Sequence, residues 1–364
     1  MKLKNPAFSQ SFFMSVVVLV IFGILMVYDA SVVYSLSVFG GKYHFLLKQA
    51  GWALLGFTGF ILASKVNLNL VKKLAFPFFA LSMFLLLVVL IPGVGSEYLG
   101  ARRWLNLGFT SLQPAELAKL SFIVYYAFLI PKIKEPKKHL LVFTGLLGFV
   151  AGFIVLEPDL GTALVVGTVG VGMYFLSGAP LKHFFIMAPL VLVAVSGFIF
   201  ISPYRRDRLL TFINPQNAQN LEEGYHTNQA LIAIGSGGIF GLGPGKSRQK
   251  YAYLPEVATD SIFAVVCEEF GFLGSTILLG LLGFTVLRGF KIAASASKLE
   301  YKLLSGGVML WFGGQSLLNL AAISGLVPLT GVPLPLISYG GSAIIFMLVG
   351  LGLVLNVSRR NSKS

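Results

Sequence analysis

The amino-acid sequence predicts an all-α polytopic membrane protein with about ten transmembrane helices and one large extracellular loop between helices 7 and 8. Of its 364 residues, 56% are hydrophobic and only 12% are charged, whereas a soluble domain carries about 25% charged residues. The mean hydropathy is +0.83. Apolar stretches of about 20 residues, the length that crosses a bilayer, recur along the chain. Soluble enzyme folds are therefore excluded.

Ten stretches have the length and composition of a membrane span. The first has no small-residue cleavage site after it, which predicts an anchor and not a removed signal peptide. Between the fifth and sixth stretches lies only Glu157-Pro158-Asp159, which predicts a helical hairpin. We expect a single integral membrane domain over residues 1–364. The spans are predicted at 11–30, 45–63, 73–92, 113–130, 140–157, 159–177, 184–202, 261–287, 303–325 and 340–357.

The distribution of charge predicts the orientation. Placing the N-terminus inside puts 17 Lys and Arg residues and two acidic residues on that side, against ten basic and nine acidic residues on the other. Cytoplasmic loops collect Lys and Arg, so both termini are predicted to be cytoplasmic. The net charge of +14 then reports topology and does not indicate a nucleic-acid partner. The single cysteine, Cys267, excludes an intrachain disulfide.

The connection at 203–260 is predicted to be a single extracytoplasmic loop. Most other connections are about 5–20 residues long, and long loops in compact architectures are usually functional. Two moderately apolar stretches in it, near 227–235 and 251–258, are too short to span a bilayer and are predicted to lie along the interface. The chemistry is expected on this outer face.

Two polar patches in other loops allow more than one interpretation. Arg102 and Arg103 precede Trp104, so they form either a phosphate clamp, because guanidinium matches phosphate oxygens, or an interfacial anchor. Glu157 and Asp159 at the hairpin tip could bind a cation or a sugar hydroxyl, or form a solvated turn.

Four charged residues are predicted in the bilayer interior, where ionisable groups are costly and usually functional. Glu116 and Lys119 are three residues apart on one helix face and can pair. Glu268 and Glu269 cannot face lipid comfortably, so at least one of them is expected to meet a basic partner or an internal cavity. Lys119 is the one basic residue predicted within the bilayer, which makes it the expected partner for them.

Asp260 stands at the start of the eighth span, at the predicted membrane surface. It could simply balance the positive end of the helix dipole or carry chemistry. Glycines at 235–245 precede it and predict a backbone that approaches other segments closely. Their spacing differs from that of a nucleotide-binding loop.

The motifs taken together resemble the SEDS family (shape, elongation, division and sporulation), the group that contains RodA and FtsW. The resemblance covers almost the whole chain. It depends on GARRWLNLG at 100–108, QPAELAKL at 113–120, EPDLGTA at 157–163, RLLTFINP at 208–215, AIGSGGIFGLG at 233–243, SRQKYAYLPE at 247–256, TDSIFAVVCEEFGFLG at 259–274 and LPLISYGGS at 334–342.

The resemblance implies a peptidoglycan glycosyltransferase that polymerises lipid II, a disaccharide-pentapeptide on undecaprenyl pyrophosphate. Asp260 matches the family's essential aspartate, acting as general base on the acceptor hydroxyl or as the ligand of a divalent cation, Mg²⁺ or Mn²⁺. The remaining positions that match the family are Arg103, Arg205 and Arg208 for the pyrophosphate, Gln229, Ser247 and Lys250 around the site, and Glu116, Lys119 and Glu268 as support for the cavity.

The resemblance also implies a class B penicillin-binding protein (a transpeptidase) and division (divisome) proteins as partners. The S-x-QK-xx-YLPE string favours the division member FtsW over RodA, and hence the bacterial cytoplasmic membrane at the septum. A lipid II flippase and a non-catalytic scaffold for the transpeptidase remain alternatives. Four positions depart from the family pattern: His226 and Ala230 replace Gln and Ser, Ser261 replaces Phe, and Cys267 replaces Gly.

Overall fold

Long apolar helices dominate the structure, a computed structural model that describes residues 6–98, 101–106, 108, 111–185, 187, 189, 196, 197, 200, 203–213, 222–251 and 254–361. Within these residues, eight helices are long and apolar enough to cross a membrane, and a shorter apolar helix, α6, accompanies them. The polytopic helical fold predicted from the sequence is confirmed. The predicted seventh span at 184–202 lies largely outside the described residues.

The helices match the predicted spans in order. The first group comprises α1 (Pro6–Phe39), α2 (His44–Lys65), α3 (Leu68–Val89), α4 (Pro114–Leu129) with the short helix η1 (Ile130–Lys132), α5 (Pro136–Leu156) and α6 (Leu160–Leu176). The last group comprises α10 (Ile262–Ala294), α11 (Leu299–Ile323) and α12 (Gly341–Asn361).

Local sequence explains where several helices begin. The side chain of Asn67 caps α3 by accepting from the backbone N–H of Asn69, and Asp159 caps α6 by accepting from that of Thr162. Pro114 and Pro136 stand in the first turns of α4 and α5, where a missing N–H has no cost. The predicted hairpin at Glu157-Pro158-Asp159 is confirmed as the turn between α5 and α6.

The connection before α4 contains a small sheet that the sequence analysis did not foresee. Strands β1 (Gly95–Tyr98), β2 (Ala101–Asn106) and β3 (Ser111–Leu112) pair antiparallel in that order. Strands of two to six residues leave no clear periodic signal. The Arg-Arg-Trp patch therefore lies on a strand and not in an irregular loop.

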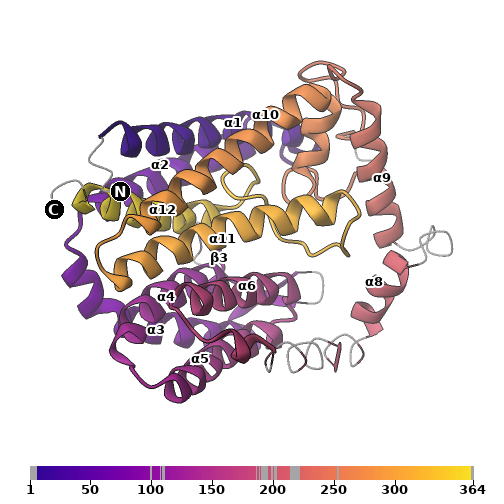
Figure 1. Ribbon diagram of the computed structural model, residues 1–364. Helices are drawn as coiled ribbons and strands as arrows, with labels where there is room; N and C mark the ends of the chain where they lie inside the picture. Colours follow the sequence, from indigo (N-terminus) through magenta and orange to yellow (C-terminus); the bar gives the residue numbers. More distant parts are fainter. Residues whose placement is uncertain are drawn as a thin grey trace.

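Two helices lie within the long connection at 203–260. They are α8 (Pro203–Ile213) and α9 (Glu222–Ser236). The apolar stretch at 227–235 lies in α9, whereas the described residues of 251–258 form turns. In Figure 1 both helices lie at the end of the bundle away from the last residues of α12.

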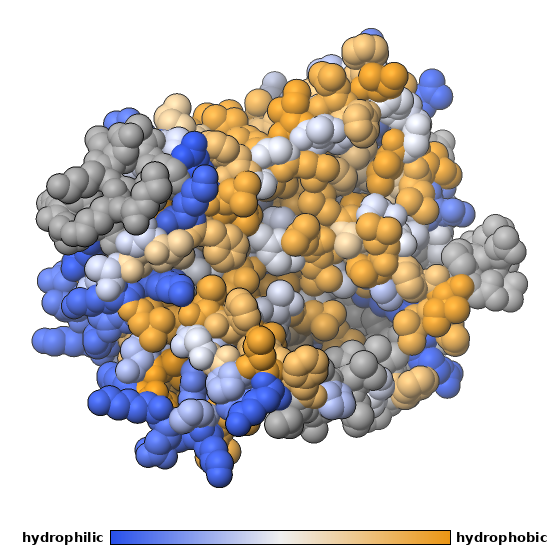
Figure 2. Space-filling view, viewed as in Figure 1, coloured by the Kyte–Doolittle hydropathy of each residue, from blue (hydrophilic) through white to orange (hydrophobic). Residues whose placement is uncertain are grey.

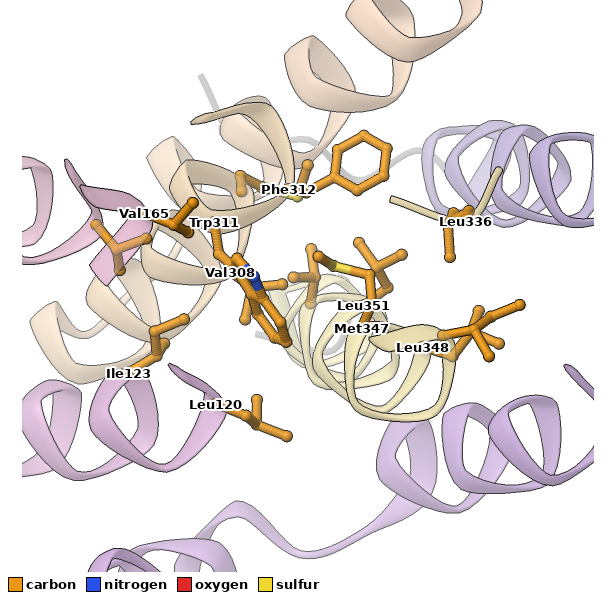
Figure 3. Close-up of a cluster of buried hydrophobic side chains, with 14 of the residues drawn as sticks. Leu120, Ile123, Val165, Val308, Trp311, Phe312, Leu336, Met347, Leu348 and Leu351 are labelled. Atoms are coloured by element: carbon orange, nitrogen blue, oxygen red, sulfur yellow. The ribbon is translucent and has the colours of Figure 1, made fainter. Parts of the chain in front are cut away.

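Helix α4 forms the centre of the bundle. In its apolar stretch 83% of residues are buried, against 22% in α2. Figure 3 shows side chains from four helices meeting around Trp311. They come from α4 (Leu120, Ile123), α6 (Val165), α11 (Val308, Phe312) and α12 (Met347, Leu348, Leu351). Residues of α4 are thus surrounded by protein and not by lipid.

The surface is divided as expected for a membrane protein. Figure 2 shows apolar residues across the middle of this face and hydrophilic residues gathered toward its ends. Contacts join residues predicted on one side: Lys72 pairs with Glu300 at 2.6 Å, and Arg360 donates to Asn67. Helix α1 begins and α12 ends at the same end of the bundle in Figure 1.

Candidate active site

Asp260 lies in a tight turn immediately before α10. The backbone N–H groups of Thr259 and Ser261 both donate to the carbonyl of Glu256, whose φ is +48°. A positive φ at a non-glycine residue is strained, and such strain persists where the surroundings enforce it. The Oδ1 atom of Asp260 is buried and has no hydrogen-bond partner among the described residues. This carboxylate oxygen is therefore shielded by the protein and is not engaged by any described residue.

The segment 334–340, from the LPLISYGGS motif, clamps this turn. Ser338 Oγ donates to the carbonyl of Thr259, and the N–H of Tyr339 donates to the carbonyl of Ala258 at 2.8 Å. Gln49 of α2 donates to the carbonyl of Ser338 at 3.2 Å. Leu336, also in this segment, has a φ of +65°. Two strained segments thus brace each other beside Asp260.

Helix α11 links the turn to the centre of the bundle through two buried amides. Asn319 donates to the carbonyls of Asp260 at 2.8 Å and Val332 at 2.7 Å. One turn earlier, Gln315 donates to the carbonyl of Pro333 at 2.9 Å and accepts from Lys119 Nζ at 2.8 Å.

The Glu116–Lys119 pair is confirmed, with Lys119 Nζ 2.7 Å from Glu116 Oε1. Trp311 adds a ring 5.1 Å from Lys119 Nζ and a 2.8 Å hydrogen bond to Gln315. Lys119 therefore supports the turn that carries Asp260 indirectly, through Gln315 and the 332–333 backbone.

The electrostatic surroundings of Asp260 suit proton transfer near neutral pH. Burial, together with the nearby Glu256 carboxylate, raises the pKa of Asp260 to about 7, although hydrogen bonds within the turn and the Arg208 guanidinium oppose the rise. A base of this strength is ionised in part at neutral pH and can accept a proton there. Arg208 also donates to the carbonyl of Leu329 at 3.0 Å, which places α8 beside the segment that Asn319 holds.

The glycine-rich segment, residues 235–245, packs against a break in α10. At Gly271, φ is +63° and ψ is −165°, so the helix is interrupted there. The N–H groups of Phe272 and Leu273 donate to the carbonyls of Gly238 and Ile239. A Cβ on Gly271 would lie 2.3 Å from the backbone nitrogen of Gly241. The predicted close approach of this backbone is confirmed, and glycine at 271 is required for it.

Glu268 and Glu269 precede the break and hold the next part of the loop. Glu268 accepts from Ser247 Oγ at 2.5 Å and from the N–H of Arg248 at 3.0 Å. Glu269 Oε1 lies 3.1 Å from Lys250 Nζ, which also contacts Asp29 of α1 at 2.9 Å. Burial disfavours the charged form of the lysine, but the hydrogen bonds that Lys250 donates to the carboxylates of Asp29 and Glu269 raise its pKa above its usual value.

The expectation that Lys119 pairs with Glu268 or Glu269 is wrong. Lys119 is satisfied within α4 and by α11, and Lys250 from the loop takes the place beside Glu269. Lys250 was expected on the outer face, because the sequence carries no local signal for a loop that folds back into the bundle. Asp29, the third member of the cluster, was likewise counted with the outer charges.

Arg103 and the α5–α6 hairpin form a separate cluster. Arg103 donates from Nε to the carbonyl of Glu157 at 3.2 Å and from its terminal nitrogen to that of Pro158. Its Nε lies 4.0 Å from Asp159 Oδ2. Gln113 adds a 3.4 Å hydrogen bond to Asp159. The side chains of Glu157 and Asp159 are only 0% and 6% exposed, so the interpretation as a solvated turn is wrong.

Glu157 is unusual in this cluster because neither carboxylate oxygen has a partner among the described residues. Burial raises the pKa of Glu157 to about 9, Asp159 contributes to the rise, and Arg103 opposes it. Glu157 is therefore protonated at neutral pH.

The predicted site residues thus fall into distinct groups. Asp260 and Arg208 lie in one neighbourhood, and Gln229 follows on α9, one turn after His226, which contacts Ser261. Arg205 lies on α8, but its side chain is outside the described residues. The other groups are Glu116 with Lys119, Ser247 and Lys250 with Glu268, and Arg103 with the hairpin.

Sequence reasoning missed the buried amides Gln49, Gln315 and Asn319. They are 0%, 1% and 2% exposed and all hold backbone carbonyls around the turn. A signal for them existed, because polar side chains inside apolar spans are rare and usually have a partner.

Comparisons with known proteins agree with this architecture. Residues 9–363 match the model of the FtsW/RodA/SpoVE family, described as a cell cycle protein. The chain is 35% identical over 351 residues to a probable peptidoglycan glycosyltransferase FtsW of Geobacter sp. (strain M18), covering 95% of both chains. It is 37% identical over 341 residues to the stage V sporulation protein E of Bacillus subtilis (strain 168), covering 93% of both.

Solved structures show the same fold. A chain from a structure described as the structural coordination of polymerization and crosslinking by a peptidoglycan synthase complex superposes with a TM-score of 0.81 at 31% identity, covering 97% of this chain and 98% of that one. The rod shape determining protein RodA of Thermus thermophilus superposes with a TM-score of 0.71 at 31% identity, covering 96% of both. This multi-pass membrane protein therefore belongs to the FtsW/RodA/SpoVE family of cell cycle proteins, the SEDS family that its motifs resemble.

Proposed function

We propose that this chain is a peptidoglycan glycosyltransferase that polymerises lipid II at the outer face of the bacterial cytoplasmic membrane, for septal wall synthesis during cell division. The observation that carries the proposal is the Asp260 carboxylate, whose Oδ1 is buried and has no partner in the described part of the chain, in a turn braced from α2, α11 and the 334–340 segment. The names of the FtsW relatives and of the synthase complex support it.

The proposed reaction forms one glycosidic bond. Asp260 accepts the proton of the acceptor sugar's 4-hydroxyl as that oxygen attacks the anomeric carbon of the donor. The bond from that carbon to the undecaprenyl pyrophosphate breaks, and the pyrophosphate leaves with the electron pair. Because the pKa of Asp260 lies at about 7, the carboxylate is basic enough to accept this proton and still ionised in a useful fraction.

Arginines are the expected ligands of the pyrophosphate, since their guanidinium groups match phosphate oxygens. Arg208 is the best supported, because its charge acts on Asp260. Arg205 lies three residues earlier on the same helix, and Arg103 borders the hairpin cluster. Gln229 is proposed to contact the sugars. Ser247 and Lys250 are 0% and 5% exposed and bonded to Glu268 and Glu269, so we assign them to holding the loop around the substrate.

The site could hold a divalent cation, Mg²⁺ or Mn²⁺, through one or two carboxylates but not through a full set of protein ligands from the described part of the chain. Among the residues described, no three His, Cys, Asp or Glu side chains cluster as a ligand set. The unpartnered Oδ1 of Asp260, with Glu256 nearby, suits a cation that takes one or two carboxylates and completes its shell with phosphate and water. When bound there, the cation would neutralise charge on the departing pyrophosphate.

The proposal includes partners and orientation. The excess of Lys and Arg at one end predicts cytoplasmic termini, so α8, α9 and Asp260 would lie outside. A class B penicillin-binding protein would crosslink the product, and divisome proteins would recruit the pair to the septum. The structurally similar synthase complex supports a transpeptidase partner.

The test is a gel assay of lipid II polymerisation by purified protein with its transpeptidase, comparing wild type with Asp260→Asn, with and without Mg²⁺ or Mn²⁺. We expect glycan ladders from wild type and a loss of at least 100-fold in the variant. Full activity of Asp260→Asn would reject the assignment. Transbilayer movement of labelled lipid II by proteoliposomes of this protein, without polymerisation, would favour the flippase. Growth supported by Asp260→Asn would favour a scaffold.

A further inference from the structure

The two departures from the family pattern that lie nearest Asp260 contact each other. His226 Nε2 of α9 lies 2.6 Å from Ser261 Oγ, the residue directly after Asp260. Ser261 is 0% exposed and is the N-cap of α10, yet its side chain makes no capping bond to the helix. Its hydroxyl is thus committed to α9 and not to the helix that it starts.

The His226–Ser261 bond differs from the other hydrogen bonds that hold the turn containing Asp260. The carbonyls of residues 258–260 are fixed from α11 and the 334–340 segment. The His226–Ser261 bond is a side-chain contact to the turn from α9. If this bond were lost, the turn would keep its hydrogen bonds to α11 and to the 334–340 segment but would lose this side-chain contact with α9.

The imidazole is suited to a constant role in holding the turn. Burial, helped by the Arg208 charge, lowers the pKa of His226 to about 4. The charge that acts on this imidazole is Arg208 on α8, and the same guanidinium acts on Asp260, beside Glu256 in the turn before α10. With a pKa of about 4 the imidazole is neutral near pH 7, so it adds no positive charge that would weaken Asp260 as a base.

We propose that His226 is a positioning residue for Asp260: through Ser261 it fixes the start of α10 against α9 and so aims the Asp260 carboxylate at the acceptor hydroxyl. The inference rests on the proposed glycosyltransferase function. A residue that orients the base acts on the transition state, so its loss lowers kcat and leaves KM nearly unchanged.

The experiment measures steady-state lipid II polymerisation by the full-length protein with its transpeptidase. Ser261→Ala and His226→Leu are each expected to lower kcat about tenfold, the worth of one buried hydrogen bond. The double variant should also lose about tenfold and not about 100-fold, because both changes remove the same contact. His226→Gln, which keeps a neutral amide near the position of Nε2, should stay within about threefold of wild type.

The matched control is Ser15→Ala. Ser15 is a buried helical serine whose hydroxyl bonds the carbonyl of Phe12 in its own helix, and its loss should leave kcat unchanged. A second readout does not need activity: ¹⁵N-histidine spectra of the protein in nanodiscs. The chain has four histidines, so His226→Leu identifies the resonance. It should remain neutral from pH 5 to 8 and shift in Ser261→Ala.

The outcomes separate the two proposals. The positioning role would be overturned, while the proposed function stands, by any one of four results. These are additive losses in the double variant, a His226→Gln variant as slow as His226→Leu, wild-type rates in Ser261→Ala, and an imidazole resonance that does not shift in Ser261→Ala. If wild type makes no glycan from lipid II that a control synthase polymerises, the proposed function fails, and the positioning role fails with it.

Discussion

The side-chain amide of Asn319 in α11 donates a 2.8 Å hydrogen bond to the backbone carbonyl of Asp260. The same nitrogen holds the carbonyl of Val332 at 2.7 Å. One buried amide thus joins three parts of the chain at the candidate catalytic residue. The position of Asp260 depends on the packing of α11 as much as on the turn that contains it.

Replacing Asn319 by Leu should therefore damage both stability and activity. Two buried carbonyls lose their donor, at a cost of about 1–3 kcal/mol for each unsatisfied group. We expect a lower thermal unfolding temperature and a polymerisation rate reduced at least about tenfold.

Asn356 provides the matched control for Asn319. It is 4% exposed, and its Nδ2 also donates to two carbonyls, those of Ala63 and Val66, at 2.8 and 2.7 Å. Asn356→Leu should lower the unfolding temperature similarly but leave the rate of the folded protein unchanged. Equal rate losses in both variants would show that Asn319 acts only through stability.

The buried pair of Glu116 and Lys119 should show strong coupling. Lys119→Met alone leaves the Glu116 carboxylate buried among α4 and α11, and breaking a buried pair costs about 3–5 kcal/mol. Glu116→Gln with Lys119→Met removes both charges and should lose clearly less than the sum of the single changes. Thermal unfolding of the four proteins in nanodiscs measures this. Additive losses would contradict the coupling.

Lys250 should lock the glycine-rich loop to the bundle. Lys250→Met leaves Asp29 and Glu269 facing each other without a cation. We expect faster hydrogen exchange of backbone amides over residues 243–251, measured by mass spectrometry. Lys246→Met, at an exposed lysine four residues earlier, should leave exchange unchanged. If the backbone amides of the loop exchanged as slowly in Lys250→Met as in wild type, the backbone contacts at Gly271 would be enough to hold the loop against the bundle.

Glu157 should make stability depend on pH. Its pKa is about 9 in the folded protein, above its ordinary value of 4.5, so the folded state binds a proton more tightly than the unfolded state. Its stabilising contribution is complete below about pH 4.5 and is lost as the pH rises toward 9, by at most about 1.4 kcal/mol per pH unit. Unfolding temperatures from pH 5 to 9 should fall less steeply in Glu157→Gln, a neutral isostere. Equal slopes would mean that Glu157 is ionised when folded.

Several features could be predicted from the sequence because they depend on local composition. Apolar length located the spans, since the bilayer thickness fixes how many residues a helix needs. The spacing of Glu116 and Lys119 sufficed for their pairing, because residues three apart share a helix face. The glycines between 235 and 245 indicated close backbone approach, which Gly237 and Gly241 make against α10. The motifs around Asp260 were specific enough to indicate the family.

Other features were decided by the tertiary structure. The partner of Glu269 is Lys250, which comes from a loop that folds back against α10. Lys119, the one basic residue predicted within the bilayer, is held instead by Glu116 and Gln315. Glu157 and Asp159 are buried because Arg103 from a small sheet covers them. The contact between His226 and Ser261 joins α9 to the start of α10, which are separated by a connection of turns and glycines. Composition and local spacing identified the residues that carry chemistry. Which of them act together was determined by packing, because burial and pairing depend on which segments meet in three dimensions.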